Sequence, residues 1–269
     1  MNATCFVFHG QLIYLFWVVV LFCTSSKTAP VFAQSAGSTS GSVVYRQEWG
    51  SGVDKQAVLV FRPGESLYYF QRKDRKKASL DPILVDEAGN SAEYSIDVAD
   101  REGMSYYMNT SRQQLVSRTF DFFSNDYLII EEPIPALAWV IGTQIRTIGK
   151  YEAQQATCTF RGRNWTVWFT PEIPVGLGPW KLQGLPGLIL EARDSENKCV
   201  CEMISIDMPA KINTPVLPPQ KGKVVGNWMA YEKATRASAD KWAKSMTSRG
   251  PGMSAKPILD EGIEKITEL

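Results

Sequence analysis

Short runs of strand-forming residues separated by turn signals divide this chain, and that rhythm limits the fold more than any other feature. Pro63-Gly64, for example, separates two such runs, which is a typical signal for a β-hairpin. About a dozen short strands, with no helical pattern before residue 226, predict a mainly β fold. We expect a curved antiparallel meander, a half-barrel or barrel that limits its exposed edges. The predicted strands are 43–49, 56–62, 66–71, 92–98, 104–108, 113–120, 126–131, 137–149, 154–161, 165–170, 188–193 and 198–207.

The N-terminal segment predicts export. Residues 11–22 form an apolar run that fits a signal peptide and is short for a bilayer span. Val31 and Ala33 suit the positions before a cleavage site, so residues 1–33 are expected to be removed, although no Lys or Arg precedes the apolar run. An uncut anchor and a lipoprotein at Cys23 are the alternatives. The expected location is the periplasm, the cell envelope or the medium, with no membrane span after cleavage.

The remaining chain divides by composition into four parts. Residues 34–42 are rich in Ser and Gly and are expected to be a flexible linker. Residues 43–208 carry the predicted β domain. Residues 209–225 form a proline-rich connector, which cannot continue a sheet. Residues 226–269 are expected to be helical and to pack on the sheet.

One amphipathic helix is predicted after the connector. Asn227 is expected to cap it, and residues 249–252 carry the Gly and Pro that end helices. Packing of its apolar stripe on the sheet is the simpler interpretation, and a partner-binding or lid helix is the alternative. The stripe consists of Trp228, Tyr231, Trp242 and Met246.

Charge and histidine content exclude several functions. The chain has 29 basic and 28 acidic residues, and residues 1–33 contain only Lys27, so the mature chain has 28 of each. A chain with balanced charges lacks the net positive charge that is typical of nucleic-acid-binding proteins. The only histidine is His9, so the cleaved chain would have no histidine that could serve in a nucleophile pair or as a metal ligand. No metal or cofactor is expected.

Three cysteines remain after cleavage: Cys158, Cys199 and Cys201. Residues two apart on a strand are about 6.6 Å apart, too far for a disulfide with good geometry, so Cys199 and Cys201 should not pair. Two possibilities remain: a disulfide between Cys158 and one of these two cysteines, or three unpaired structural thiols.

The segment from residue 161 to 181 is rich in tryptophan and charge. Strand alternation places Trp165, Val167 and Phe169 on one face, and Thr166, Trp168 and Thr170 on the other. The first face is expected to fill the core, and the second to line a ligand groove together with Trp180. The alternative is core packing with an Arg163–Glu172 ion pair. The candidate ligand-binding residues are Arg163, Trp168, Glu172, Trp180 and Lys181.

Gly184-Leu185-Pro186-Gly187-Leu188-Ile189 reads as a stiff turn before a hairpin formed by 188–193 and 198–207. Pro186 and Gly187 suit the second and third positions of a type II turn, in which Gly187 would have a positive φ.

The same six residues resemble the signature of the GLPGLI family, exported proteins mainly from Bacteroidetes with no established activity. Gly162-Arg163, residues 165–174 and Gly178-Pro179-Trp180 are similar to the family segment that precedes the signature. Ala153 stands where the resemblance predicts a cysteine. The resemblance implies an exported protein but no chemistry.

The leading functional hypothesis is a non-catalytic cell-envelope module that binds an apolar, peptide or lipid-like ligand. The second is a structural module that docks onto another envelope protein by a sheet edge or the helix. The third is a histidine-free hydrolase that uses carboxylates. Its candidates are Asp121, Asp126, Glu131, Glu132 and Glu172. Ser238 and Lys241 match an acyl-enzyme pattern without its companion motifs, so no catalytic residue is assigned.

Overall fold

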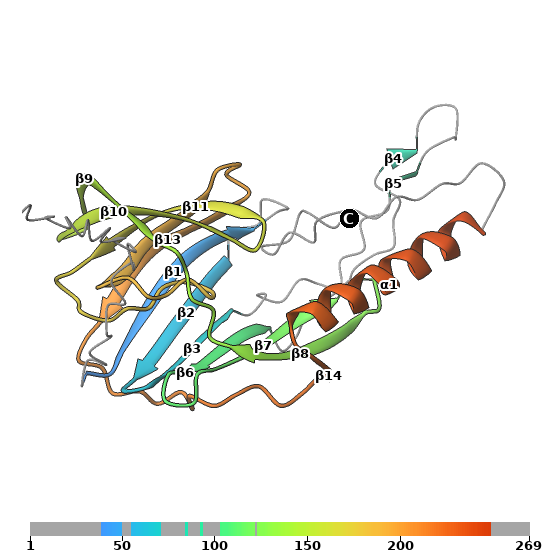
Figure 1. The fold of residues 1–269 in the computed structure, drawn as a ribbon, viewed down its shortest axis with the longest axis horizontal. Helices are drawn as coiled ribbons and strands as arrows, with labels where there is room; N and C mark the ends of the chain where they lie inside the picture. Colours follow the sequence, from blue (N-terminus) through green and yellow to red (C-terminus); the bar gives the residue numbers. More distant parts are fainter. Residues whose placement is uncertain are drawn as a thin grey trace, which may run out of the picture. The chain divides into compact units, whose positions relative to one another are not determined.

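A computed structural model describes residues 39–49, 55–70, 84–85, 92–93, 103–121 and 123–248 (Figure 1). The predicted signal peptide, most of the predicted linker and the tail from residue 249 lie outside the described residues. The strands are β1 (Gly41–Trp49), β2 (Lys55–Arg62), β3 (Glu65–Phe70), β4 (Leu84–Val85), β5 (Ala92–Glu93), β6 (Met104–Asn109), β7 (Gln114–Asp121), β8 (Asp126–Pro133), β9 (Val140–Ile148), β10 (Tyr151–Phe160), β11 (Arg163–Thr170), β12 (Leu188–Asp194), β13 (Cys199–Asp207) and β14 (Lys223–Gly226), and the helix is α1 (Trp228–Thr247).

One twelve-stranded sheet organises the described chain, in the order β14-β8-β7-β6-β3-β2-β1-β13-β12-β11-β10-β9. Every pair is antiparallel except β14 with β8. The β1–β13 pair is far apart in sequence and joins two meanders. One consists of β1, β2, β3, β6, β7 and β8, and the other of β9 to β13. The sheet ends at β9 and β14 in the part of the chain that the structure describes, so it is not closed into a barrel. The predicted mainly β fold with a C-terminal helix is confirmed. The end of the predicted connector, however, joins the sheet as β14, so the expectation that residues 209–225 stay outside it is wrong.

The two faces of the sheet are covered by different means. The inner face, defined by Trp165, Val167 and Phe169 of β11, carries the main apolar core. The outer face of the β2–β8 half is covered by the proline-rich connector, whose Val216 is buried against Val60. On β2, Leu59 and Val60 are therefore buried on opposite faces, whereas on β3 the outer-face residues Leu67 and Tyr69 are only partly buried.

Helix α1 lies along β8 and β14 (Figure 1). Asn227 caps it by accepting a hydrogen bond from the backbone N–H of Ala230 at 3.0 Å. Tyr231 packs against Leu128 and Ile130 of β8, and the ring of Trp242 meets that of Phe123 at 5.8 Å. The apolar stripe of the helix thus faces the sheet, as expected.

The three described cysteines are all free and buried. Two strands separate Cys158 on β10 from Cys199 and Cys201 on β13. A separation of three strand spacings is about 14 Å, beyond the reach of a disulfide. Burial raises the pKa of each thiol to about 12.

The described part of the chain contains no helix of the length and apolarity needed to cross a bilayer.

Candidate functional site

The five candidate ligand-binding residues do not form one site, although Trp180 and Lys181 lie together. Trp180 and Lys181 are fully buried against the inner face, whereas Trp168 is half-buried on the outer face and Glu172 is exposed. Trp168 and Trp180 therefore do not line a common groove. Strand alternation correctly placed Trp165 and Trp168 on opposite faces, but it contains no information about the loop that carries Trp180.

Arg163 forms a buried ion pair with Asp194, with 2.6 Å between Nη1 and Oδ2. The other oxygen of Asp194 accepts the backbone N–H of Cys199 at 2.9 Å, so the pair fixes the turn between β12 and β13. Glu172 instead accepts the N–H of Glu152 at 2.7 Å, at the start of β10. The ion pair of Arg163 thus differs from the Arg163–Glu172 pair considered from the sequence, and both residues support strand ends.

Gly187 is required by close packing, and the predicted type II turn is wrong. Its φ lies outside the left-handed region, and the positive φ of this segment is at Gly184, at 94°. A Cβ on Gly187 would lie 2.0 Å from the carbonyl oxygen of Thr170. Pro186 is exposed. A glycine at this position lets residues 184–188 pass directly against the end of β11.

The loop between β11 and β12 is held by backbone hydrogen bonds. Gly184 donates to Gly176 at 3.0 Å, and Ile189 donates to Leu177 at 2.9 Å. Trp180 has a φ of 58°, which is uncommon for a bulky residue, so the surrounding packing must hold it there. Its ring packs on Trp165 with 5.6 Å between centroids.

Lys181 is the first part of a buried charged group on the inner face. Its Nζ lies 2.9 Å from Oε1 of Glu132 on β8, and the side chain of Lys181 has no exposed surface. Arg161, which follows β10 with a φ of 51°, pairs with the other oxygen of Glu132. One carboxylate therefore joins the β8 strand, the β10–β11 turn and the β11–β12 loop.

Aromatic rings enclose these charges. Cζ of Arg161 lies 3.9 Å from the ring centroid of Trp228, the first residue of α1. Nζ of Lys181 lies 5.6 Å from the same ring and 5.8 Å from the ring of Tyr106. We name this group the inner cluster. It comprises Tyr106, Glu132, Arg161, Trp180, Lys181 and Trp228.

The inner cluster keeps its carboxylate ionised. Burial by itself would raise the pKa of Glu132, but the charges and hydrogen bonds of Lys181 and Arg161 outweigh it and leave the pKa below its ordinary value of 4.5. A carboxylate held ionised by two cations is a poor proton donor near neutral pH. The two cations face aromatic rings, an arrangement that suits cation–π contact.

The sequence contained a signal for a buried Glu132, which is absent from the five candidate ligand-binding residues and appears only among the hydrolase candidates. Leu128, Ile130 and Glu132 alternate along β8, so Glu132 is in phase with two core residues. A carboxylate at a core-facing position predicts a buried partner. Tyr106, Arg161 and Trp228 come from other elements, and no local pattern links them to Glu132.

A second group of the same composition lies on the outer face. Cζ of Arg146 on β9 lies 4.2 Å from the ring centroid of Trp168 on β11, and Arg146 pairs with Glu191 on β12. Arg146 is about half exposed, at 43%. We name Arg146, Trp168 and Glu191 the outer cluster.

Edge strand β9 exposes large apolar side chains. Val140, Ile141 and Ile145 are 68%, 37% and 57% exposed. Ile145 pairs with Gln154, which pairs in turn with Phe169, so Ile145 lies on the inner face. Ile141 reaches the same face through Ala156 and Val167. The apolar inner face therefore continues to β9, the last strand of the sheet among the described residues.

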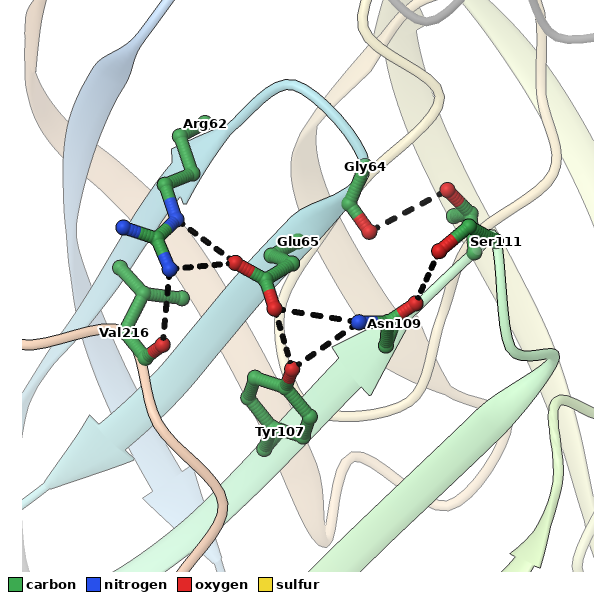
Figure 2. A network of polar contacts seen from close by, with 8 residues as sticks. Arg62, Gly64, Glu65, Tyr107, Asn109, Ser111 and Val216 are labelled. Carbon is green, nitrogen blue, oxygen red and sulfur yellow. Dashed lines mark hydrogen bonds and ion pairs between the residues drawn. The ribbon is translucent and has the colours of Figure 1, made fainter.

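A polar network around Glu65 occupies the turns at one end of β2, β3 and β6 (Figure 2). One oxygen of Glu65 accepts hydrogen bonds from Tyr107 at 2.5 Å and from Asn109 at 3.1 Å, and the other accepts from Arg62 at 2.7 Å. The hydrogen bond from Tyr107 lowers the pKa of Glu65 most. Arg62 also reaches the carbonyl of Val216 at 3.5 Å. The network ties two hairpins to the connector.

Four of the five carboxylates considered for hydrolysis have separate structural contacts, and the fifth, Asp126, lies opposite Asp121 across β7 and β8. Asp121 accepts hydrogen bonds from the N–H of Phe123 at 3.2 Å and the hydroxyl of Ser124 at 2.6 Å, and so closes a turn. Glu131 accepts from Gln114. Glu132 belongs to the inner cluster and Glu172 to the start of β10. No cluster of three potential metal ligands occurs within the described ranges.

Comparison with known proteins gives one short family match. Residues 160–191 match a family described as a protein of unknown function (Porph_ging). The matched segment runs from the end of β10 into β12, so it includes Arg161, Trp180, Lys181 and Gly187. No curated protein matches the chain.

Several solved structures show remote likeness. Two structures of PNGF-II, solved in different space groups, align with a TM-score of 0.49 at 14% and 12% identity, over 75% of this chain and 33% and 34% of theirs. The chain thus spans about a third of the length of those proteins. An uncharacterized conserved protein from Thermus thermophilus aligns with a TM-score of 0.38 at 10% identity, over 72% of this chain and 94% of its own. Likenesses at these TM-scores carry no conclusion about this chain.

Proposed function

We propose that this chain is an exported, non-catalytic cell-envelope module of the GLPGLI type, and that it binds an extended peptide segment along edge strand β9. The observation that carries the proposal is the exposed apolar row on β9, which continues the inner face to the last strand of the sheet in the described part of the chain. Export rests on the apolar segment at residues 11–22, and the GLPGLI assignment on Gly184–Ile189 and its preceding segment.

The chemistry of a strand edge selects the ligand class. In an edge strand of an antiparallel sheet, alternate residues turn their N–H and C=O groups away from the sheet. Such a row is matched by another extended backbone, as in peptide recognition by strand addition. A small apolar ligand or a lipid chain would leave these polar groups unmatched.

Side chains of an added strand would find a partner surface on β9. Ile141 and Ile145 face the same side as Val167 and Phe169, so an apolar residue beside them would extend the core. At about 25 cal/mol per Å² of apolar surface removed from water, this burial would favour binding. Proteins commonly protect long edges with several charges or proline, and β9 contains one charged residue, Arg146, and no proline.

A bulge determines which part of β9 is suited to pairing. Three β9 residues, Gly142 to Gln144, lie opposite the single residue Gln155. The regular part is therefore Ile145–Ile148, next to the hairpin turn. We propose that the peptide pairs with this part and that its side chain packs toward Ile141 and Ile145.

The other functional hypotheses receive less support. Trp180 is fully buried in the core, where a ligand would have to displace packed rings. Of the candidate carboxylates, Asp121 and Asp126 lie opposite one another across β7 and β8, but Asp121 already accepts hydrogen bonds from Phe123 and Ser124 in the turn. Docking of a folded envelope protein remains the second candidate, because a strand of such a partner would use the same edge.

A display library of random ten-residue peptides, selected on the wild-type protein, tests the proposal. Selected peptides should bind Ile145→Lys at least tenfold more weakly, because a lysine at an edge position opposes strand addition. Ile204→Lys is the matched control, since Ile204 is 52% exposed but lies on β13, inside the sheet. It should bind like the wild type. A library that yields no peptide, or peptides that bind both variants equally, would contradict the proposal.

A further inference from the structure

We infer that the inner cluster without Trp228 is a receptor for an aromatic ring. Trp228 of helix α1 occupies this receptor, and a peptide or small molecule with an aromatic ring can take its place when α1 lifts. This inference concerns the inner face and is independent of peptide binding at β9.

The receptor is built without the helix. Glu132, Arg161 and Lys181 are joined by ion pairs and come from β8, the β10–β11 turn and the β11–β12 loop. Tyr106 and Trp180 belong to β6 and to the same loop. Without α1, Arg161 and Lys181 would still be held by Glu132, and the rings of Tyr106 and Trp180 would still lie beside Lys181.

Trp228 contacts the receptor mainly through those cations. Its ring lies 3.9 Å from Cζ of Arg161 and 5.6 Å from Nζ of Lys181. Tyr231 of the same helix packs on Trp228 with 5.2 Å between centroids. A cation–π contact depends on the ring and not on the backbone that carries it. Any aromatic ring of similar size therefore meets the same attraction.

Within the described residues, few side chains attach α1 to the sheet. Of its twenty residues only Tyr231, Thr235 and Ala239 are buried. Thr235 contributes a hydroxyl that is buried without a hydrogen-bond partner, which weakens the contact further. The apolar cluster beneath the helix consists of Leu128, Ile130 and Tyr231, with Val225 and Trp228 against it.

A hinge precedes the helix. Gly226 has a φ of 90° and ends β14, directly before the N-cap. The connector is fixed upstream, because Nε of Arg118 donates to the carbonyl of Lys221 at 2.7 Å. Movement of α1 about Gly226 would thus leave the sheet and the connector in place.

Two measurements on the full chain test the inference. In the first, hydrogen exchange of the wild type should show α1 amides exchanging about 100-fold or more faster than those of β12, because local opening of α1 would need less free energy than global unfolding. Exchange of α1 and β12 at the same rate would overturn the inference, since α1 would then leave only on unfolding.

In the second, indole serves as the probe. Trp228→Ala should leave a vacancy that indole fills, as engineered apolar cavities bind benzene. Millimolar indole should then raise the unfolding temperature of Trp228→Ala by a few degrees. Trp242→Ala, on the same helix but away from the cations, should show no rise. Equal shifts in both variants, or no shift in a folded Trp228→Ala, would overturn the inference. If Trp228→Ala does not fold, the exchange measurement decides.

Discussion

The inner and outer clusters contain the same three kinds of group in different surroundings. Trp180 with Lys181 and Glu132 is buried on one side of the sheet, whereas Trp168 with Arg146 and Glu191 is partly exposed on the other. In each, a cation stands near an indole ring and pairs with a carboxylate. Their chemistry is alike, so burial is the main difference.

Burial changes what each group contributes. An exposed ion pair contributes about 0–1 kcal/mol, because water and salt screen its charges. Removing one partner of a buried pair costs about 3–5 kcal/mol, because a charge is left without compensation away from water. The inner cluster should therefore be intolerant of substitution, and the outer cluster tolerant. The following predictions test this difference, from the largest expected effect to the smallest.

The largest effect is expected from removal of the two indoles. Trp180→Ala should lower the free energy of unfolding by about 3–5 kcal/mol, because the packed ring leaves a cavity. Trp168→Ala should cost less, about 1–2 kcal/mol, because this ring is only partly buried against the core and its cation–π contact with Arg146 is partly exposed. Urea denaturation of both variants gives the comparison. Equal costs would show that the two clusters do not differ as their burial suggests.

A smaller effect is expected from the glycine that fixes the loop of the inner cluster. Gly187→Ala should cost about 1–3 kcal/mol, because its Cβ would meet the Thr170 carbonyl at 2.0 Å and the backbone would have to shift. Gly142→Ala, near the outer cluster, is the matched control, since the nearest atom to its Cβ would be 3.4 Å away. It should change stability little. Thermal unfolding checks both, and a neutral Gly187→Ala would contradict the packing argument.

The smallest effect is expected from acid titration of Glu132. Its pKa in the folded protein is lowered, so its contribution to stability is complete above the ordinary value of 4.5 and is lost as pH falls through the folded pKa. The free energy of unfolding of the wild type should therefore decrease below about pH 4.5. Glu132→Gln should show a weaker decrease over the same range in urea titrations. Identical pH dependence would mean that the inner carboxylate does not titrate as the geometry implies.

Local patterns in the sequence determined much of the fold. Alternation along 165–170 separated the inner from the outer face because side chains on a strand point to opposite sides in turn. The spacing of Trp228, Tyr231 and Trp242 predicted the sheet-facing stripe of α1, and Asn227 its start. The spacing of Cys199 and Cys201 correctly excluded a disulfide between them. Each of these conclusions depends on geometry within a few residues.

Only the tertiary structure decided the pairing of β1 with β13 and the composition of the inner cluster. Lys181 and Glu132 are 49 positions apart in the sequence, and no pattern of neighbouring residues around either one predicts their contact. Gly187 illustrates the same point: its sequence neighbours suggested a turn, but the atom that requires a glycine belongs to Thr170 on another segment. Contacts between distant segments depend on how the chain closes its loops, and strand and turn propensities act only between neighbours.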